Sequence, residues 1–341
     1  MEKPVLDNVQ ASLRKKEESL RQWMSEASPD DKALMLGSSS EADVVSHLAV
    51  VDNSLESCES ASLGRCTVCH DFIEPGLLMV DYTASVCLSH LSGEEADRLE
   101  HELELAQTVQ MALLPSRSPD IPGLEVAAFS RPAQIVGGDY FDFIPFASGD
   151  YGLLLGDVAG HGVSASLHMA SLQGLSRAIV STSRSPAEVL AQIHRLFIHN
   201  IRYTTFVTLF LAAFDAETKN LAYANAGHNP PLVLSAESAS QTVRWLHPTG
   251  AAIGLVEESK YEERRLTLTR GDVVALYTDG VVEASGASGE PYGADRLVDV
   301  VRSLRKESAQ DIVRGVTRNL EDFVEGRPLA DDATLVVAKV T

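Results

Sequence analysis

Four short motifs, each built around an aspartate, stand out in the last two-thirds of the chain. Each aspartate begins or ends an apolar, strand-like run, so the backbone can hold its carboxylate in a defined position. Glycine near the aspartate in the first three motifs lets a cation or a second backbone segment approach closely. The motifs are Gly137-Gly138-Asp139-Tyr140-Phe141-Asp142, Gly156-Asp157-Val158-Ala159-Gly160-His161-Gly162, Tyr277-Thr278-Asp279-Gly280 and Asp331-Asp332-Ala333-Thr334.

Grouped carboxylates of this kind are suited to binding divalent cations. Carboxylates without a nearby Lys or Arg repel one another unless a cation joins them. Mg²⁺ and Mn²⁺ prefer oxygen ligands, and two such ions can share a water, lower its pKa and direct it at phosphorus. A single Asp-Gly at a strand end is more often a plain turn. The spacing alone therefore leaves two alternatives open, a two-cation site and a set of unrelated turns.

A second group of candidate ligands lies earlier in the chain, at Cys66, Cys69, Cys87 and His90. They form two pairs, each with two residues between its members. Residues 70–86 separate the pairs and include an apolar, strand-like stretch. This spacing predicts a structural Zn²⁺ held by three thiolates and one imidazole. Buried free cysteines are the alternative, His70 is a competing ligand, and Cys58 is expected to lie outside the site.

Composition limits the classes of function. The chain has 28 Lys and Arg against 48 Asp and Glu, a net charge of −20, which disfavours nucleic acid and anionic membranes as partners. No run approaches the ~20 apolar residues of a membrane span, and the first residues lack the apolar segment of a signal peptide. We therefore expect a cytoplasmic protein without nucleic-acid or membrane partners. A length of 341 residues suits a catalytic domain plus a smaller module.

The elements that must position these residues begin with helices. Apolar residues at helical spacing predict helices over residues 5–26 and 40–60, joined as an antiparallel hairpin. A Ser-x-x-Glu capping box at Ser92 predicts a third helix that ends at Pro115. Its narrow apolar stripe favours equally a coiled-coil seam and packing against the chain's own domains. The stripe consists of Ala96, Leu99, Leu103, Ala106 and Leu113.

Short strand-like runs dominate from residue 119 onwards. Turn residues separate several of them, as in antiparallel hairpins, and strands in runs with helices in blocks indicate an α+β fold. Strands are expected at residues 124–130, 151–157, 206–214, 221–225, 232–234, 243–246, 273–277 and 334–340, and helices at 162–183, 186–200 and 308–324.

Over about residues 105–340 the chain resembles the bacterial PPM (PP2C-like) phosphatases of the SpoIIE/RsbU class. The order and spacing of the four acidic motifs and the strands beside them agree with that family. The resemblance also includes Leu113-Leu114-Pro115, Asn225-Ala226-Gly227-His228-Asn229-Pro230 and Leu335-Val336-Val337. It implies two packed antiparallel β-sheets flanked by helices.

The same resemblance implies two Mn²⁺ or Mg²⁺ ions and a water that they activate, without a covalent phosphoenzyme. Asp157 would bridge both ions, and the carbonyl of Val158 would complete one coordination sphere. Asp139 would hold one ion. Asp279 and Asp331 would hold the other. On this basis Asp139, Asp157 and Asp279 act in catalysis through the metal-bound water.

Other polar residues of these motifs are expected to have different roles. We do not expect Asp142 or Asp332 to be ligands. His161 is interpreted as a loop residue near the site, and His228 as a partner in a structural hydrogen bond.

The cysteine module resembles the zinc finger of the DksA/TraR family, whose fourth ligand is normally Cys and not His. A helical hairpin precedes the finger in that family, which implies binding related to transcription. The predicted organisation is therefore a helical hairpin at 1–62, a zinc finger at 63–91, a linker helix at 92–115 and a PPM-type phosphatase domain at 116–341.

The leading functional hypothesis is a metal-dependent protein Ser/Thr phosphatase. The resemblance implies a phosphoprotein substrate, such as an anti-sigma-factor antagonist. The alternative is a regulatory protein that acts on transcription machinery through its N-terminal module, with the phosphatase domain as a sensor. A third hypothesis, a phosphodiesterase, is disfavoured by the net charge of −20. A coiled-coil seam on the linker helix would imply a homodimer, and packing of the stripe within one chain is the alternative.

Overall fold

The computed structural model describes residues 93–160, 162–197, 206–236 and 243–341, and scattered positions between residues 14 and 87. The chain divides into two compact units, Met1–Glu102 and Leu103–Thr341. In the described part of the chain, no helix is long and apolar enough to span a membrane.

The first unit is described at few positions, and these are helical between residues 14 and 25 and between residues 42 and 55. The Arg21 guanidinium donates two hydrogen bonds to the Asp52 carboxylate, at 3.0 and 2.8 Å. This ion pair brings the two helical segments together, as a hairpin requires. Most of the predicted hairpin lies outside the described residues, and the four domain boundaries stay a prediction.

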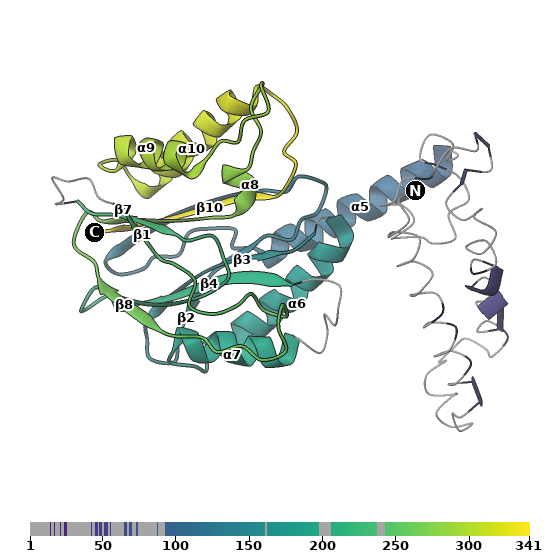
Figure 1. Cartoon of the computed structure of the whole chain (residues 1–341), viewed down its shortest axis with the longest axis horizontal. Helices are drawn as coiled ribbons and strands as arrows, with labels where there is room; N and C mark the ends of the chain where they lie inside the picture. Colours follow the sequence, from purple (N-terminus) through teal and green to yellow (C-terminus); the bar gives the residue numbers. More distant parts are fainter. Residues whose placement is uncertain are drawn as a thin grey trace. The chain divides into compact units, whose positions relative to one another are not determined.

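Two five-stranded antiparallel sheets form the centre of the second unit (Figure 1). The expected α+β fold with two packed antiparallel sheets is therefore confirmed. In spatial order the first sheet contains β1 (Leu124–Arg131), β10 (Ala333–Val340), β9 (Val273–Tyr277), β6 (Leu232–Leu234) and β7 (Val243–Trp245). The second sheet contains β2 (Tyr140–Pro145), β3 (Tyr151–Val158), β4 (Val207–Phe214), β5 (Asn220–Ala226) and β8 (Arg264–Thr267).

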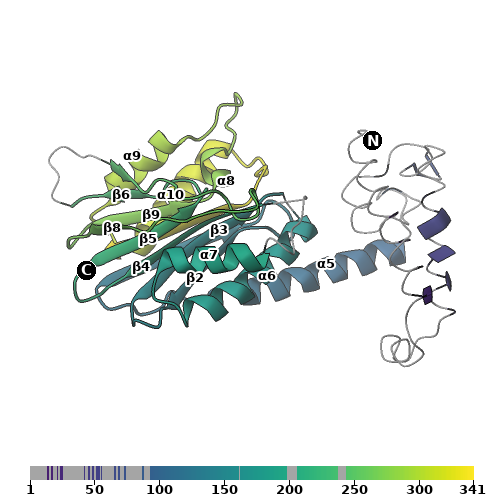
Figure 2. The ribbon, with the colours of Figure 1, turned by 60° about the horizontal axis from the view of Figure 1, so that its bottom comes forward.

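Helices cover the outer faces of both sheets. In Figures 1 and 2, α6 and α7 lie against the second sheet, and α10 lies against the first sheet with α9 beside it. The helices are α5 (Gly93–Leu113), α6 (Gly162–Val180), α7 (Pro186–Phe197), the single turn α8 (Asp279–Val282), α9 (Ala294–Leu304) and α10 (Ala309–Val324).

The central strands are apolar on both faces because both faces are covered. In β3, Leu153 and Leu155 pack between the sheets, whereas Leu154 packs toward α6 and α7. In β4, Phe210 lies between the sheets and Leu211 on the helical side. Successive side chains of these strands still point to opposite faces of the sheet. Because both faces are buried, the sequence shows a continuous apolar run.

The sequence analysis did not predict four of the elements, because these elements lack a strong apolar run. Strand β2 contains the charged Asp142, and β8 is a short edge strand that exposes Arg264 and Arg265. Helix α9 follows Gly293, which has φ of +81°, and buries one narrow stripe of side chains. Helix α8 is a single turn at Asp279.

Strand register brings the four acidic motifs to one end of the sandwich. In the second sheet Tyr140 pairs with Gly156, so Asp139 and Asp157 are neighbours across β2 and β3. In the first sheet Leu335 pairs with Tyr277, so the residues just after β9 meet those just before β10. Each sheet therefore contributes two of the predicted metal-binding aspartates.

Candidate metal centre

Asp139 is fixed by a residue of the opposite sheet. The Thr278 hydroxyl donates to Asp139 Oδ2 at 2.9 Å and accepts a hydrogen bond from the backbone N–H of Thr334 at 2.9 Å. The other oxygen, Asp139 Oδ1, is buried and has no hydrogen-bond partner. Because an unpartnered buried carboxylate oxygen is costly, this atom is suited to a cation.

The carboxylates act on one another electrostatically. Burial, followed by the charge of Asp157, raises the pKa of Asp139 well above its usual range. Burial and the charges of Asp279, Asp331 and Asp332 raise the pKa of Asp157 to about 7. These shifts show that without a cation the ionised forms are unfavourable together. A divalent cation would relieve this repulsion.

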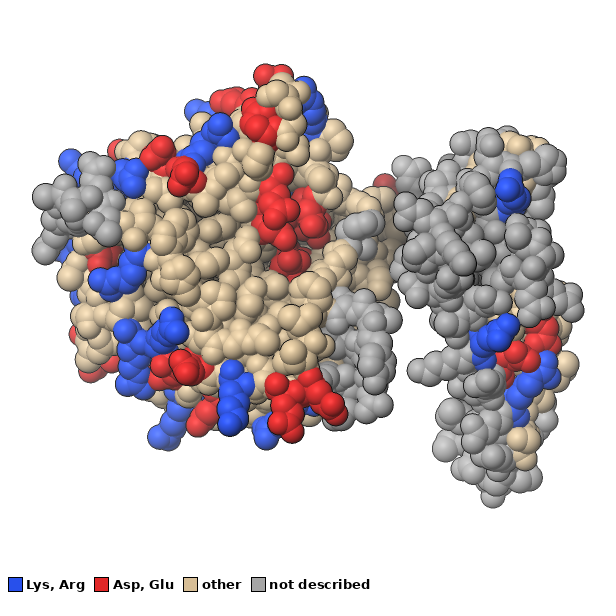
Figure 3. All heavy atoms as spheres, in the orientation of Figure 1, with Lys and Arg blue, Asp and Glu red and all other residues tan. Residues whose placement is uncertain are grey.

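The first sheet supplies the two more accessible aspartates, Asp279 and Asp331. Asp279 is half-buried at the start of α8, and its pKa is raised by burial and by the charge of Asp331. Asp331 is exposed and precedes β10. Figure 3 shows acidic side chains gathered near α8, with no basic side chain among them in the described part of that face. The predicted aspartates therefore converge at one accessible acidic site.

Glycines allow backbone segments to approach one another closely beside this group. A Cβ on Gly138 would lie 2.8 Å from the carbonyl oxygen of Val158, the backbone atom that the resemblance assigns to a cation. A Cβ on Gly280 would collide with the backbone of Asp332. The donors are all oxygen atoms, as Mg²⁺ and Mn²⁺ prefer. The residues present therefore fit divalent cations, although the roles of the individual ligands stay a proposal.

Asp332 and Asp142 use their carboxylates to hold protein groups. Asp332 accepts hydrogen bonds from the backbone N–H groups of Ala133, at 2.7 Å, and Gly138, at 2.6 Å. Asp142 accepts from the Tyr140 hydroxyl, at 2.6 Å, and from Arg177 Nε, at 2.7 Å. These contacts give both aspartates a structural role.

His228 is a buried structural residue. Its Nδ1 lies 2.8 Å from the hydroxyl of Thr208, which pairs with Asp157 across β3 and β4. Burial lowers the pKa of His228 to about 3, so the ring is neutral at pH 7 and is a poor general acid. His161 lies outside the described residues.

Two contacts that position the site were not found from the sequence. One is the Thr278 hydroxyl described above. The other joins α5 to the loop before Asp139: Gln110 Nε2 donates to the carbonyl of Gly137 at 2.5 Å, and Gly137 N–H donates to Gln110 Oε1 at 3.0 Å. The only signal in the sequence was that Gln110 interrupts an apolar stripe.

Three cysteines of the first unit form a separate cluster. The sulfur atoms of Cys66, Cys69 and Cys87 lie within 4.8 Å of one another, and Val68 N–H donates to Cys66 Sγ at 3.4 Å. Among the described residues, no set of three carboxylates meets the same distance limit. His90, the predicted fourth ligand, lies outside the described residues.

Comparison with known proteins places the second unit in a family. The family model described as stage II sporulation protein E (SpoIIE) matches residues 147–341, more than half of the chain. The chain belongs to the SpoIIE family. The match includes the motifs of Asp157, Asp279 and Asp331.

Three relatives illustrate what this SpoIIE-family chain is similar to. Phosphoserine phosphatase RsbU of Bacillus subtilis is 29% identical over 71% of this chain and 70% of its own. The SiaA-PP2C domain of Pseudomonas aeruginosa has a TM-score of 0.64 at 24% identity, over 72% of this chain and 98% of that domain. The structure of the RsbU and RsbW domains of Rv1364c from Mycobacterium tuberculosis has a TM-score of 0.55 at 30% identity. The match covers 65% of this chain and 61% of that chain. The expected PPM-type phosphatase fold is confirmed.

From the acidic site we predict an effect of Mn²⁺ on the melting temperature, which can be measured without a substrate. Asp157→Asn removes one of the repelling charges, so in EDTA the variant should melt at or above the temperature of the wild type. At a hundredfold excess over its dissociation constant, Mn²⁺ should raise the wild-type melting temperature by roughly 5 °C. The variant should lose most of this rise, as measured by differential scanning fluorimetry.

Asp322→Asn is the matched control, because Asp322 is an exposed residue of α10 outside the acidic motifs. It should retain the full Mn²⁺ effect. An equal Mn²⁺ effect in wild type and Asp157→Asn would contradict the proposed site.

Proposed function

We propose that this chain is a Mn²⁺- or Mg²⁺-dependent phosphatase that removes phosphate from serine or threonine of a partner protein. The observation that carries the proposal is the meeting of Asp139 and Asp157 from one sheet with Asp279 and Asp331 from the other. Membership of the SpoIIE family and the PP2C fold support the same activity.

The chain's own residues would hold the reacting groups in place. Bound cations supply Lewis-acid chemistry and an activated water at such a site. Thr278 keeps one oxygen of Asp139 engaged and leaves the other for a cation. Helix α6 begins at Gly162, shortly after Val158, and the N-terminus of a helix favours a nearby phosphate group.

The proposed substrate is a phosphoprotein of the anti-sigma-factor antagonist type. RsbU is named a phosphoserine phosphatase, and the Rv1364c structure contains an RsbU domain together with an RsbW domain. These relatives support the substrate class and not a particular protein. The alternative, action on transcription machinery through the N-terminal module, stays a prediction because most of that module lies outside the described residues.

The cysteine cluster supports a second metal site with a structural role. We propose that Zn²⁺ is held there by Cys66, Cys69, Cys87 and His90. Three sulfur atoms within 4.8 Å of one another match the size of a tetrahedral site. Zinc in this place would connect the two ligand pairs, which residues 70–86 separate, and its binding would contribute to folding.

Helix α5 supports a proposal about assembly and control. The described members of the predicted stripe, Leu103, Ala106 and Leu113, are half-buried within the chain, whereas Leu105 and Val109 are 58% and 55% exposed. We therefore place a homodimer contact on the exposed row. Because Gln110 on the same helix holds the loop before Asp139, a shift of α5 on assembly would reach the acidic site.

The activity is tested with p-nitrophenyl phosphate in the presence of Mn²⁺. Asp157→Asn and Asp279→Asn should each lower kcat/KM by at least ~100-fold, because the activated water depends on the cations. Asp322→Asn should behave like wild type. Near-normal turnover by either site variant, with a folded protein and saturating Mn²⁺, would refute the proposed chemistry.

The zinc site is tested by metal analysis of freshly purified protein. The wild type should contain about one tightly held Zn²⁺ per chain, and Cys66→Ser and His90→Ala should lose it. Cys58→Ser is the control and should retain the metal. Full zinc content in Cys66→Ser would show that the metal is bound elsewhere.

The homodimer is tested by sedimentation of the whole chain. Leu105→Glu combined with Val109→Glu should convert a dimer to a monomer, because two charges per chain would be buried in the contact. Leu196→Glu, at an exposed position of α7, is the control and should leave the dimer intact. A wild type that is monomeric at high concentration would rule out this assembly.

A further inference from the structure

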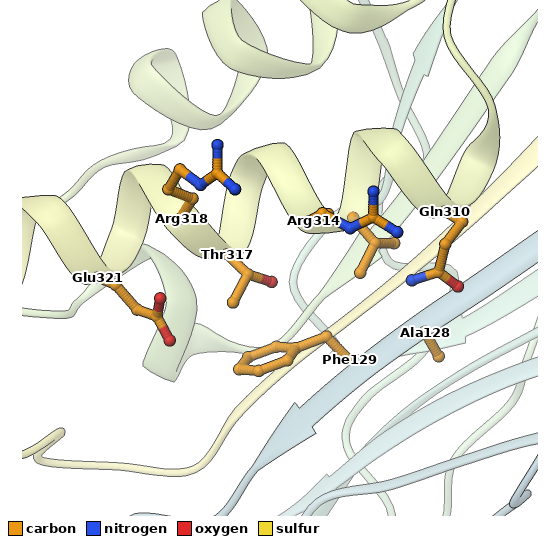
Figure 4. Close-up of a pocket in the computed structure, with 8 residues that line it drawn as sticks. Ala128, Phe129, Gln310, Arg314, Thr317, Arg318 and Glu321 are labelled. Atoms are coloured by element: carbon orange, nitrogen blue, oxygen red, sulfur yellow. The ribbon is translucent and has the colours of Figure 1, made fainter.

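A groove lies between α10 and β1, on the outer side of the first sheet (Figure 4). Its volume is about 310 Å³. Strand β1 contributes Ala128 and Phe129, and α10 contributes Gln310, Arg314, Thr317 and Arg318 among others. The acidic motifs of the metal centre take no part in it.

One wall of the groove is an edge strand. Strand β1 is the last strand of its sheet, and no described strand pairs with its outer edge. In such a strand every second residue turns its backbone N–H and C=O outward, where they can bind another extended chain. The groove therefore offers backbone hydrogen bonds along one side.

The other wall combines positive charge with an unsatisfied polar atom. Arg314 and Arg318 lie one helical turn apart on α10 and are both exposed. Arg314 makes one ion pair, at 3.0 Å, with the half-exposed Asp311. The hydroxyl oxygen of Thr317, between the two arginines, is buried without a hydrogen-bond partner in the structure. The ring of Phe129 lies below Thr317 in Figure 4 and provides an apolar floor.

The groove runs toward the acidic site. The backbone N–H of Ala309, at the start of α10, donates to Glu125 Oε1 at 3.1 Å, so α10 begins beside the first residues of β1. At the other end of β1, Arg131 pairs with Ala333, which directly follows Asp332. Phe129 pairs with Leu335. The floor of the groove is therefore about four strand residues, or ~13 Å, from Asp331.

We propose that this groove binds an extended acidic segment of the phosphoprotein substrate, which adds to β1 as a further strand. Addition of a strand to an exposed edge is a common mode of peptide recognition. Acidic side chains of the segment face Arg314 and Arg318, and an apolar one contacts Phe129. This inference rests on the proposed function, because it assigns how that substrate is held.

Charge and shape both favour this occupant. The whole chain has a net charge of −20, so an acidic partner is repelled by most of the surface and attracted by a local basic pair. An open groove beside a strand edge, with an apolar floor, fits an extended chain better than a small anion. Glu321, which lines the same groove on α10, repels acidic residues at that position.

The direction of the bound chain decides where its acidic residues lie. A segment antiparallel to β1 runs away from the acidic site, so its acidic residues follow the phosphoserine. A segment parallel to β1 places them before the phosphoserine. Synthetic phosphoserine peptides with Glu-rich extensions on either side, starting about four residues from the phosphoserine, distinguish the two directions.

The experiment compares these peptides with Lys-rich counterparts, using the full chain with Mn²⁺. The wild type should hydrolyse one acidic peptide with a kcat/KM at least about tenfold above its Lys-rich counterpart. Arg314→Glu combined with Arg318→Glu should abolish this preference and leave p-nitrophenyl phosphate hydrolysis unchanged. Arg264→Glu combined with Arg270→Glu, an equal charge change at exposed positions outside the groove, should keep the preference.

A binding measurement separates this inference from the proposed activity. Fluorescence anisotropy of the labelled, unphosphorylated acidic peptide needs no turnover, and binding should weaken at least about tenfold in the groove variant. Arg314→Lys combined with Arg318→Lys should largely restore it. Equal binding by wild type and groove variant, or an equal loss in the control variant, would overturn the proposal. Failure of p-nitrophenyl phosphate hydrolysis with peptide binding intact would refute the activity alone.

Discussion

Repulsion among carboxylates at the shared end of two sheets is the constraint on which this structure depends. Asp139 and Asp157 follow from the pairing of β2 with β3, and Asp279 and Asp331 from the meeting of β9 with β10. The two packed sheets hold the four groups close together, although burial and neighbouring charge raise the pKa values of Asp139, Asp157 and Asp279. The apolar packing between the sheets must therefore offset an unfavourable electrostatic energy, which a bound cation would convert into a stabilising one.

The fold was predictable where apolar runs are continuous, and less so elsewhere. Strands β6 and β9 have the predicted bounds because every residue in them is buried. Strand β2 was missed because Asp142 interrupts its pattern, and the residue that compensates this charge, Arg177, lies on α6. A contact between residues so far apart in the sequence leaves no local signal.

The same reasoning explains what was found of the site. The aspartates are visible in the sequence because each stands at the end of an apolar strand and most have a glycine nearby. The roles of Thr278 and Gln110 are not visible, because they arise from hydrogen bonds between elements that only the fold brings together. The cysteine pairs were visible from spacing alone, and three of their four members lie together.

The hydrogen bond from Thr278 to Asp139 also takes up part of the capacity of this carboxylate to bind a ligand. One oxygen already accepts from the hydroxyl, and the other has no partner and is the more open of the two to a cation. Two hard cations take about six oxygen atoms each, roughly twelve in all, which is more than a few carboxylates and one carbonyl can supply. Oxygen atoms of water and substrate would fill the remaining coordination positions, and they can exchange there. A site with so few fixed donors is suited to repeated exchange of small molecules and not to permanent storage of an ion.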